Sequence, residues 1–221
     1  MSDLTAQFNV VSDFSLKGNP NGPWTYGSAR NLGQLVPFPS LETQKGVERW
    51  YPGNGVHFPD ICRNITHKQL LVDGALLSDN ALILRPGNRF LHANTYSVVR
   101  FTAPESGNYR FQGAFEAMSI NYGGTTQSIA RDGRKLAENT FIKAHGQIWE
   151  FDIHEDMRAR EWVDFLVSES LNGDNSNDST GLVLRVERHS RAISFWLVGL
   201  AAAVASIIAF RVRRRLVPRT D

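Results

Sequence analysis

A run of nineteen residues without a charge, 192–210 (AISFWLVGLAAAVASIIAF), constrains this chain more than any other stretch. A helix rises about 1.5 Å per residue, so the run reaches the thickness of a bilayer's hydrocarbon core. Phe195 and Trp196 fall in its first turn, where aromatic rings favour the headgroup level. We therefore predict one transmembrane helix that contacts the lipid bilayer. The alternative is a buried C-terminal helix of the globular part.

The charges that flank this run predict its orientation. Five arginines follow it within residues 211–219, whereas only Arg188 and Arg191 lie close before it. Because positive charge favours the cytoplasmic side, residues 211–221 are predicted to be a basic cytoplasmic tail. The first fifteen residues show no secretory signal pattern, which favours a cytosolic domain instead. We give the arginine asymmetry more weight and predict a single-pass protein of the cell membrane.

The resulting division of the chain places a β domain at 1–187, a juxtamembrane linker at 188–191, the helix at 192–210 and the tail at 211–221. Seven of the 24 basic and one of the 22 acidic residues lie in 188–221, which leaves 17 basic and 21 acidic residues before them. A mildly acidic domain argues against nucleic-acid binding, which needs a clustered basic surface. Cys62 is the only cysteine, so an apolar core must hold the domain together without an intrachain disulfide.

Short apolar–polar alternations separated by glycine and proline turns dominate the domain. The clearest predicted strands are residues 97–104, 108–118, 125–130, 147–152, 162–168 and 182–186, with weaker ones at 8–14, 46–51 and 69–72. Residues 75–84, broken at 78–80, predict a hairpin or a strand, turn and strand. Asp132-Gly133 predicts a two-residue hairpin turn. Hardly any helical period interrupts this pattern. We therefore predict an all-β fold, a jelly-roll or β-sandwich domain, followed by the C-terminal transmembrane helix.

The parity of the strands predicts which bulky side chains lie between the sheets. Five such residues are predicted to be buried there: Trp162, Phe165, Phe111, Phe115 and Val99. Trp24 and Tyr26 share one strand face after the turn-forming segment 19–23. Such a pair either closes the edge of the core or stacks on a sugar ring, and we favour the core.

Several motifs, taken in order, resemble those of a jelly-roll domain of bacterial exported proteins, including many with a PEP-CTERM-type anchor. They are NPNGPWTYG (19–27), RPG (85–87), VVRFTAPESGNYRFQGAF (98–115), VDFLVSES (163–170) and DSTGLVLRV (178–186). The domain also resembles carbohydrate-binding modules, which implies a binding role. Arg85 stands where the family usually has histidine. VERHSR (186–191) replaces the usual Pro-Glu-Pro, so we expect a plain anchor that is not processed by a sorting enzyme.

Exposed aromatic side chains are the predicted contacts for a polysaccharide ligand. Trp50, Tyr51 and Tyr122 each lie near a glycine-containing turn and are expected to remain exposed. The loop 172–178 offers oxygen ligands for calcium, with Asp174, Asn175, Asn177 and Asp178 as candidates. The loop lacks the spacing of an EF-hand, and a turn whose side chains bond their own backbone is the alternative. No other cofactor is predicted.

Alternating acidic residues are the remaining candidates for chemistry. Glu150, Asp152, His154 and Asp156 would share one face of an extended strand, as a solvated face or, alternatively, as metal ligands or an acid–base pair. A second set, His57, Asp60 and His67, matches no metal motif and is interpreted as a surface loop.

Three functions follow from these patterns. The favoured one is a non-catalytic, membrane-anchored module that binds glycan or another cell-surface component such as a protein. The second is a surface-glycan hydrolase with Glu150 and Asp152 or Asp164 as its carboxylates. The third is a purely structural or protein-contact module.

Overall fold

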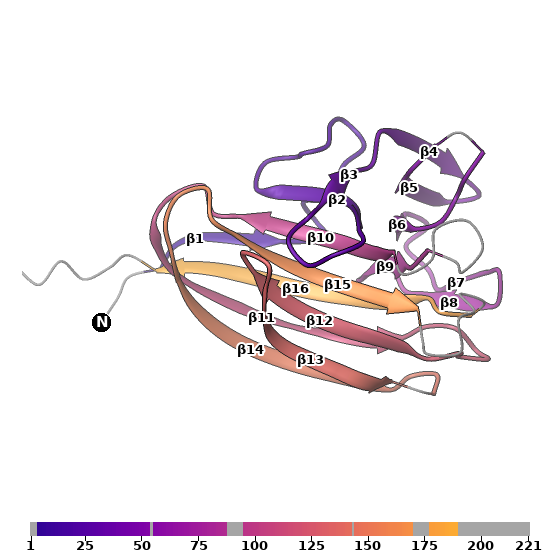
Figure 1. The fold of residues 1–221 in the computed structure, drawn as a ribbon. Helices are drawn as coiled ribbons and strands as arrows, with labels where there is room; N and C mark the ends of the chain where they lie inside the picture. Colours follow the sequence, from indigo (N-terminus) through magenta and orange to yellow (C-terminus); the bar gives the residue numbers. More distant parts are fainter. Residues whose placement is uncertain (1–3, 54, 88–94, 143, 170–176, 190–221) are drawn as a thin grey trace, which may run out of the picture.

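The computed structural model describes residues 4–53, 55–87, 95–142, 144–169 and 177–189. These residues form sixteen strands and no helix, arranged as two stacked antiparallel sheets and a small hairpin (Figure 1). The predicted all-β sandwich is confirmed. The predicted transmembrane helix lies outside the described residues, and no helix within them is long and apolar enough to cross a membrane.

Sheet A contains the C-terminal strand of the described chain near its centre. Its order is β14 (Ile148–Met157), β11 (Gly107–Ala117), β16 (Thr180–His189), β9 (Leu82–Arg85), β6 (Asp60–Asn64), β5 (Val47–Tyr51) and β4 (Ser40–Gln44). The first strand, β1 (Leu4–Asn9), also pairs with β16, and Figure 1 shows the two side by side. The two ends of the described chain therefore meet in one antiparallel pair.

Sheet B lies across the core from sheet A. Its order is β13 (Arg134–Ile142), β12 (Thr125–Arg131), β15 (Trp162–Glu169), β10 (Tyr96–Thr102), β2 (Trp24–Ala29) and β3 (Val36–Pro37). The chain crosses between the sheets from β10 to β11, from β11 to β12, and again on either side of β15. The predicted hairpin turn at Asp132-Gly133 is confirmed, with φ of 48° and 78°.

Aromatic side chains fill the space between the sheets. Trp24 and Tyr26 are fully buried, which confirms their predicted place in the core. Phe101 lies at the centre, with its ring centroid 5.1 Å from that of Trp24 and 5.6 Å from that of Phe111. Of the five residues predicted to lie there, four belong to this cluster: Val99, Phe111, Phe115 and Phe165.

Trp162 is the exception, and the prediction for it is wrong. Trp162 and Phe165 are three residues apart on one strand, so they point to opposite faces of sheet B. Phe165 points into the core, whereas the ring of Trp162 lies on the outer face, 4.7 Å from the guanidinium carbon of Arg100. The indole is half-buried there against a cation.

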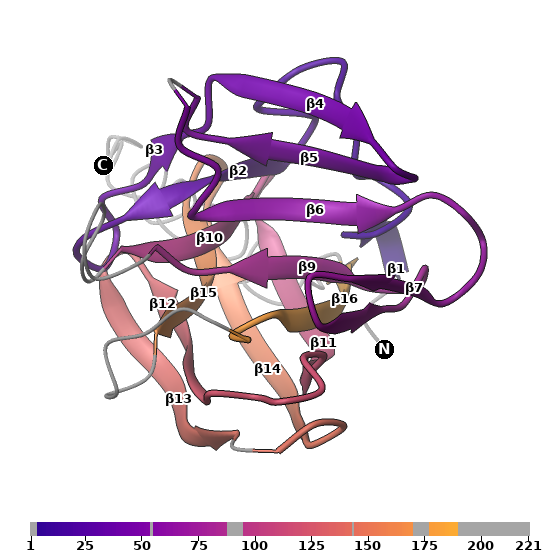
Figure 2. The same cartoon turned by 90° about the vertical axis from the view of Figure 1, so that its right-hand side faces the viewer.

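The outer face of sheet A is covered on one half only. The hairpin of β7 (Leu70–Val72) and β8 (Ala75–Leu77) packs over β5, β6 and β9, where Leu77 joins Val47, Cys62 and Ile83 in a second small core. Figure 2 shows this hairpin in front of the β9 end of the sheet. The other half, formed by β11, β14 and β16, has no such cover among the described residues.

The outer face of sheet B is covered by residues 30–35, which we call the strap. Leu32 and Leu35 of the strap pack against a third small core that includes Val98 and Leu166. The carbonyl oxygen of Gly33 accepts a hydrogen bond of 3.0 Å from Nη2 of Arg100. The strap therefore buries side chains that point away from the main core.

Candidate functional site

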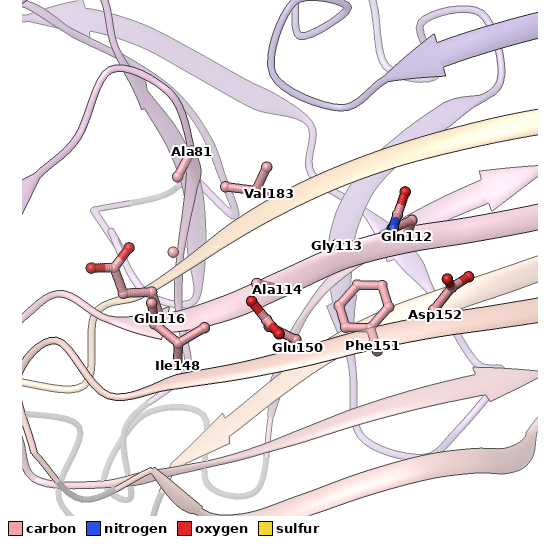
Figure 3. A pocket seen from close by; sticks show the side chains of 11 residues that line it. Ala81, Gln112, Gly113, Ala114, Glu116, Ile148, Glu150, Phe151, Asp152 and Val183 are labelled. Atoms are coloured by element: carbon pink, nitrogen blue, oxygen red, sulfur yellow. The ribbon is translucent and has the colours of Figure 1, made fainter.

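A groove with a cavity volume of about 650 Å³ lies on the uncovered half of sheet A (Figure 3). We call it the main groove. It is lined by residues of β11 and β14, most of them outward-facing, by the start of β16, and by one residue before β9. These residues are Ala81, Gln112, Gly113, Ala114, Glu116, Ile148, Glu150, Phe151, Asp152, Gly181 and Val183. Its size lies within the range of small-molecule sites.

Two glycines give the main groove its floor. A Cβ at Gly113 would lie 2.1 Å from the carbonyl oxygen of Val183 and 2.9 Å from the ring of Phe151, its cross-strand partner. A Cβ at Gly181 would lie 2.3 Å from the methyl group of Met118. Any larger residue would displace these neighbours, so both positions require glycine for close packing.

Carboxylates and an amide line the main groove, while no lysine or arginine does among the described residues. Figure 3 shows Glu116, Glu150 and Asp152 along β11 and β14, with Val183 across from them. Glu116 and Glu150 form no hydrogen bond or ion pair within the described part of the chain. They remain available as acceptors for ligand hydroxyl groups.

Asp152 differs from these two because Arg110 holds it. Nε of Arg110 donates a 2.9 Å hydrogen bond to Oδ1 of Asp152, and Nη2 donates to Oδ2. These bonds lower the pKa of the Asp152 carboxyl below its usual range, with the nearby charge of His154 a lesser cause. Asp152 therefore stays ionised near neutral pH and is unsuited to act as a general acid.

Two aliphatic side chains give the main groove apolar surface. Ile148 is 54% exposed and Val183 is 41% exposed. Together with Ala114 they provide apolar contact area between the hydrogen-bonding groups. A flat, hydroxyl-bearing ligand with apolar C–H faces matches this combination.

The face shared by Glu150, Asp152, His154 and Asp156 is confirmed, because all four side chains are exposed on β14 opposite Phe151. Asp164, the other carboxylate considered for hydrolysis, lies elsewhere. It is buried on the outer face of sheet B beneath the strap, where Arg100 binds it with two hydrogen bonds. The core separates it from Glu150, so these two carboxylates cannot act on one substrate.

The predicted aromatic contacts lie outside the main groove. Trp50 is only 4% exposed, and its Nε1 donates a 3.0 Å hydrogen bond to the carbonyl oxygen of Ser15, so the prediction of an exposed Trp50 is wrong. Tyr51 is half-buried and stacks on His57 with ring centroids 5.4 Å apart. Successive side chains of a strand point to opposite faces, which explains both positions. Trp50 points inward from β5, so the adjacent Tyr51 points outward.

Tyr122 is also tied into the fold and is not freely exposed as predicted. Its hydroxyl forms hydrogen bonds with Thr180 at 2.7 Å and with Thr125. Burial raises the pKa of the Tyr122 hydroxyl to about 12. The ring packs against the edge of the main core, so Tyr122 fixes the start of β16 beside the groove.

Half of the calcium candidates lie outside the described residues, namely Asp174 and Asn175. Asn177 has φ of 64°, and its carbonyl oxygen accepts a hydrogen bond from the amide of Gly123. Asp178 is buried, not exposed on a loop. Within the described part of the chain, no group of three or more His, Cys, Asp and Glu side chains is arranged to hold a metal ion. Calcium binding stays a prediction.

Asp60 does not lie in a surface loop as predicted, but is fully buried in β6. Arg85 binds it through a 2.8 Å bond from Nε to Oδ1 and a second bond from Nη2. The guanidinium carbon of Arg85 also lies 4.9 Å from the ring centroid of Phe58. Arg85 thus joins β9 to β6 through a structural ion pair.

Gln112 and Glu116 are the polar groove residues that sequence reasoning did not select as candidates. Both occupy polar positions in the alternating pattern of β11. This alternation was the sequence signal that could have identified them. The pairing of β11 with β14 sets Gln112 opposite Asp152 and Ala114 opposite Glu150. Only this register brings the two polar rows together.

Comparisons with known proteins assign no family. No family model matches the chain, and no curated protein matches it. Among solved structures, a cyclase from Fischerella sp. TAU is 8% identical with a TM-score of 0.43, covering 80% of this chain and 90% of its own. The K2 cleaved adhesin domain of Lys-gingipain is 13% identical with a TM-score of 0.43, covering 82% and 99%.

A family 35 carbohydrate-binding module from Clostridium thermocellum is also similar, at 12% identity and a TM-score of 0.33, covering 66% of this chain and 95% of the module. All three TM-scores lie below 0.5. None of these likenesses therefore assigns a function to this chain, and its function has to be argued from its own groove.

Proposed function

We propose that this protein is a non-catalytic module that binds a neutral glycan in the main groove. The observation that carries the proposal is the lining of that groove: uncommitted carboxylates at Glu116 and Glu150 beside exposed apolar surface at Ile148 and Val183. Carboxylates accept hydrogen bonds from sugar hydroxyl groups, and aliphatic side chains contact the C–H faces of the ring.

The charge of the main groove restricts the ligand class. Three carboxylates line it, and the arginines that lie beside it are already paired, Arg110 with Asp152 and Arg185 with Glu187. Uronate, sulfated or phosphorylated glycans would place further negative charge beside Glu116 and Glu150, where no lysine or arginine of the described residues lines the groove. Neutral sugars avoid this repulsion.

A binding experiment with the full chain tests the proposal. Neutral xylo-, cello- and manno-oligosaccharides and the acidic oligogalacturonates are titrated against the parent, Glu150→Gln and a control, Asp156→Asn. Asp156 lies on the same face of β14 but outside the main groove. We expect a neutral series to bind, oligogalacturonate not to bind, and only Glu150→Gln to weaken binding at least fivefold. Absence of binding to every neutral series would contradict the proposal.

Hydrolysis is tested with the same reagents. Asp152 is kept ionised by Arg110, so a hydrolase at this site would need Glu150 to donate the proton. For the proposed non-catalytic module, we expect no new reducing ends when the full chain is incubated with the neutral oligosaccharides. Release of product by the parent, abolished in Glu150→Gln, would instead favour the hydrolase.

We further propose that residues 192–210 anchor the module in a membrane, with the β domain outside the cytoplasm. Burial raises the pKa of the Cys62 thiol to about 12, so this sole native cysteine should resist maleimide. An impermeant maleimide should therefore label Ala159→Cys, an exposed position, in intact cells and Thr220→Cys only after lysis. The opposite labelling pattern would reverse the topology.

A further inference from the structure

A second groove, with a cavity volume of about 600 Å³, lies beside the first. We call it the side groove. It is formed by the loop after β1, the ends of β5 and β6, the loop after β6, and the turn before β9. Its lining is mostly polar and includes Ser12, Arg63, Asn64, His67, Asp79 and Asn80.

Part of this lining is committed to the fold. Arg63 donates a 2.8 Å hydrogen bond to Glu48 and a 3.1 Å bond to the carbonyl oxygen of Val11. The amide of Asn64 donates to the carbonyl oxygens of Lys68 and Leu77. These hydrogen bonds join β6 to several other segments of the chain. They therefore give the side groove a rigid base.

His67 and Asp79 are different because neither has such a partner. Both are exposed, and neither forms a hydrogen bond or ion pair within the described residues. His67 is held at φ of 56°, so its backbone is fixed in a left-handed conformation that histidine adopts more readily than most residues do. Two uncommitted hydrogen-bonding side chains thus line a rigid polar groove.

The turn of residues 78–81 joins the two grooves. Asp79 and Asn80 line the side groove, and the next residue, Ala81, lines the main groove. The turn is held by hydrogen bonds between Ser78 and Asn80, and Ala81 is buried at its end.

We infer that the ligand is a glycan chain of several sugar units that passes over the turn of residues 78–81 and occupies both grooves. This inference rests on the proposed function of the main groove and extends it. A short ligand occupies the main groove alone, whereas a longer chain reaches His67 and Asp79 across the turn. Because both contacts are made by one molecule, the second adds to affinity without a second association step.

The test compares disaccharides with hexasaccharides of the same neutral xylo-, cello- and manno-series, using the full chain. The variant combines His67→Asn, which tolerates a positive φ, with Asp79→Ala, and Asn80 is kept so that the turn retains its hydrogen bonds. Asp156→Asn is the matched control on the same sheet face. We expect the parent to bind the hexasaccharide at least tenfold more tightly than the disaccharide.

In the double variant we expect the affinity for the hexasaccharide to fall at least fivefold while that for the disaccharide is unchanged. Equal affinity of the parent for both lengths, or a double variant that behaves like the parent, overturns the inference. If Glu150→Gln still weakens disaccharide binding in that case, the proposed function stands alone. If the parent binds neither length of any series, both proposals fall.

Discussion

Two arginine–aspartate pairs, one on the outer face of each sheet, have opposite surroundings. On sheet B, Arg100 binds Asp164 with bonds of 2.6 and 2.8 Å, and the carboxylate is 1% exposed. On sheet A, Arg110 binds Asp152 with similar geometry, but the carboxylate is 41% exposed. The strap covers the first pair, and no described segment of the chain covers the second in a comparable way.

The comparison shows that the hydrogen-bond geometry of an arginine–aspartate pair does not by itself determine what the pair does. Burial under the strap raises the pKa of Asp164 despite the hydrogen bonds from Arg100 that oppose the shift. On the open face, the bonds from Arg110 dominate and lower the pKa of Asp152. The strap buries side chains on the outer face of sheet B. No described segment does so over β11, β14 and β16, and that half of sheet A is available for a ligand.

The largest expected effect is the loss of the buried pair. Arg100→Leu leaves Asp164 uncompensated under the strap and should lower the free energy of unfolding by about 3–5 kcal/mol at pH 7. Denaturant titration of the purified chain, followed by tryptophan fluorescence, measures this. The double variant Arg100→Leu/Asp164→Leu should recover most of the loss, because two apolar residues leave no buried charge. A single variant as stable as the parent would show that water reaches Asp164.

The same variant should show a characteristic dependence on pH. Without Arg100, the folded-state pKa of Asp164 rises further above its unfolded value near 3.8. A raised folded-state pKa makes stability greatest below the unfolded value and lowers it as pH rises through the folded value. The deficit relative to the parent should therefore be small near pH 4 and grow toward pH 7. A deficit that is constant with pH would contradict the burial of an ionisable Asp164.

A smaller effect is expected where the strap docks. Gly33 has φ of 81°, and a Cβ there would lie 3.0 Å from Cα of Gly133 in the β12–β13 turn. Gly33→Ala should therefore cost about 1–2 kcal/mol of stability and loosen the strap. Gly22→Ala is the control, since it also has a positive φ but no atom within 4 Å of the added Cβ. Equal losses in the two variants would mean that the contact with Gly133 contributes nothing.

The smallest effect is expected on the open face. Arg110→Leu removes an exposed pair, which solvent screens, so the free energy of unfolding should stay close to that of the parent. Thermal unfolding of this variant beside Arg100→Leu makes the comparison direct. A loss approaching that of Arg100→Leu would show that the two faces differ less in solvation than their exposures indicate.

Strand periodicity predicted the sandwich and most of its core because alternation is a local property. Phe111 and Phe115 are four residues apart and had to share a face. Trp50 and Trp162 were placed wrongly because nearness to a glycine turn, or bulk alone, was given more weight than parity. Glu150 and Asp152 of the main groove could be placed on one face because they lie two residues apart on a single strand.

The rest of the main groove could not be predicted, for a physical reason. Val183, Gln112 and Ala81 come from segments whose adjacency depends on the order of strands in sheet A. Strand order is set by long-range packing, which no local pattern encodes. Likewise, no pattern marks residues 30–35 as the cover that separates Asp164 from solvent.

The pairing of β16 with both neighbours also has a mechanical consequence. Gly181 and Val183 lie in the floor of the main groove, and His189 ends the same strand, about 20 Å farther along. The chain continues from His189 toward residues 190–221. Tension between a ligand in the groove and the C-terminal segment would therefore run along the covalent backbone of β16. Such a load would shear β16 against β11, whose ten paired residues resist together, instead of peeling them apart one at a time.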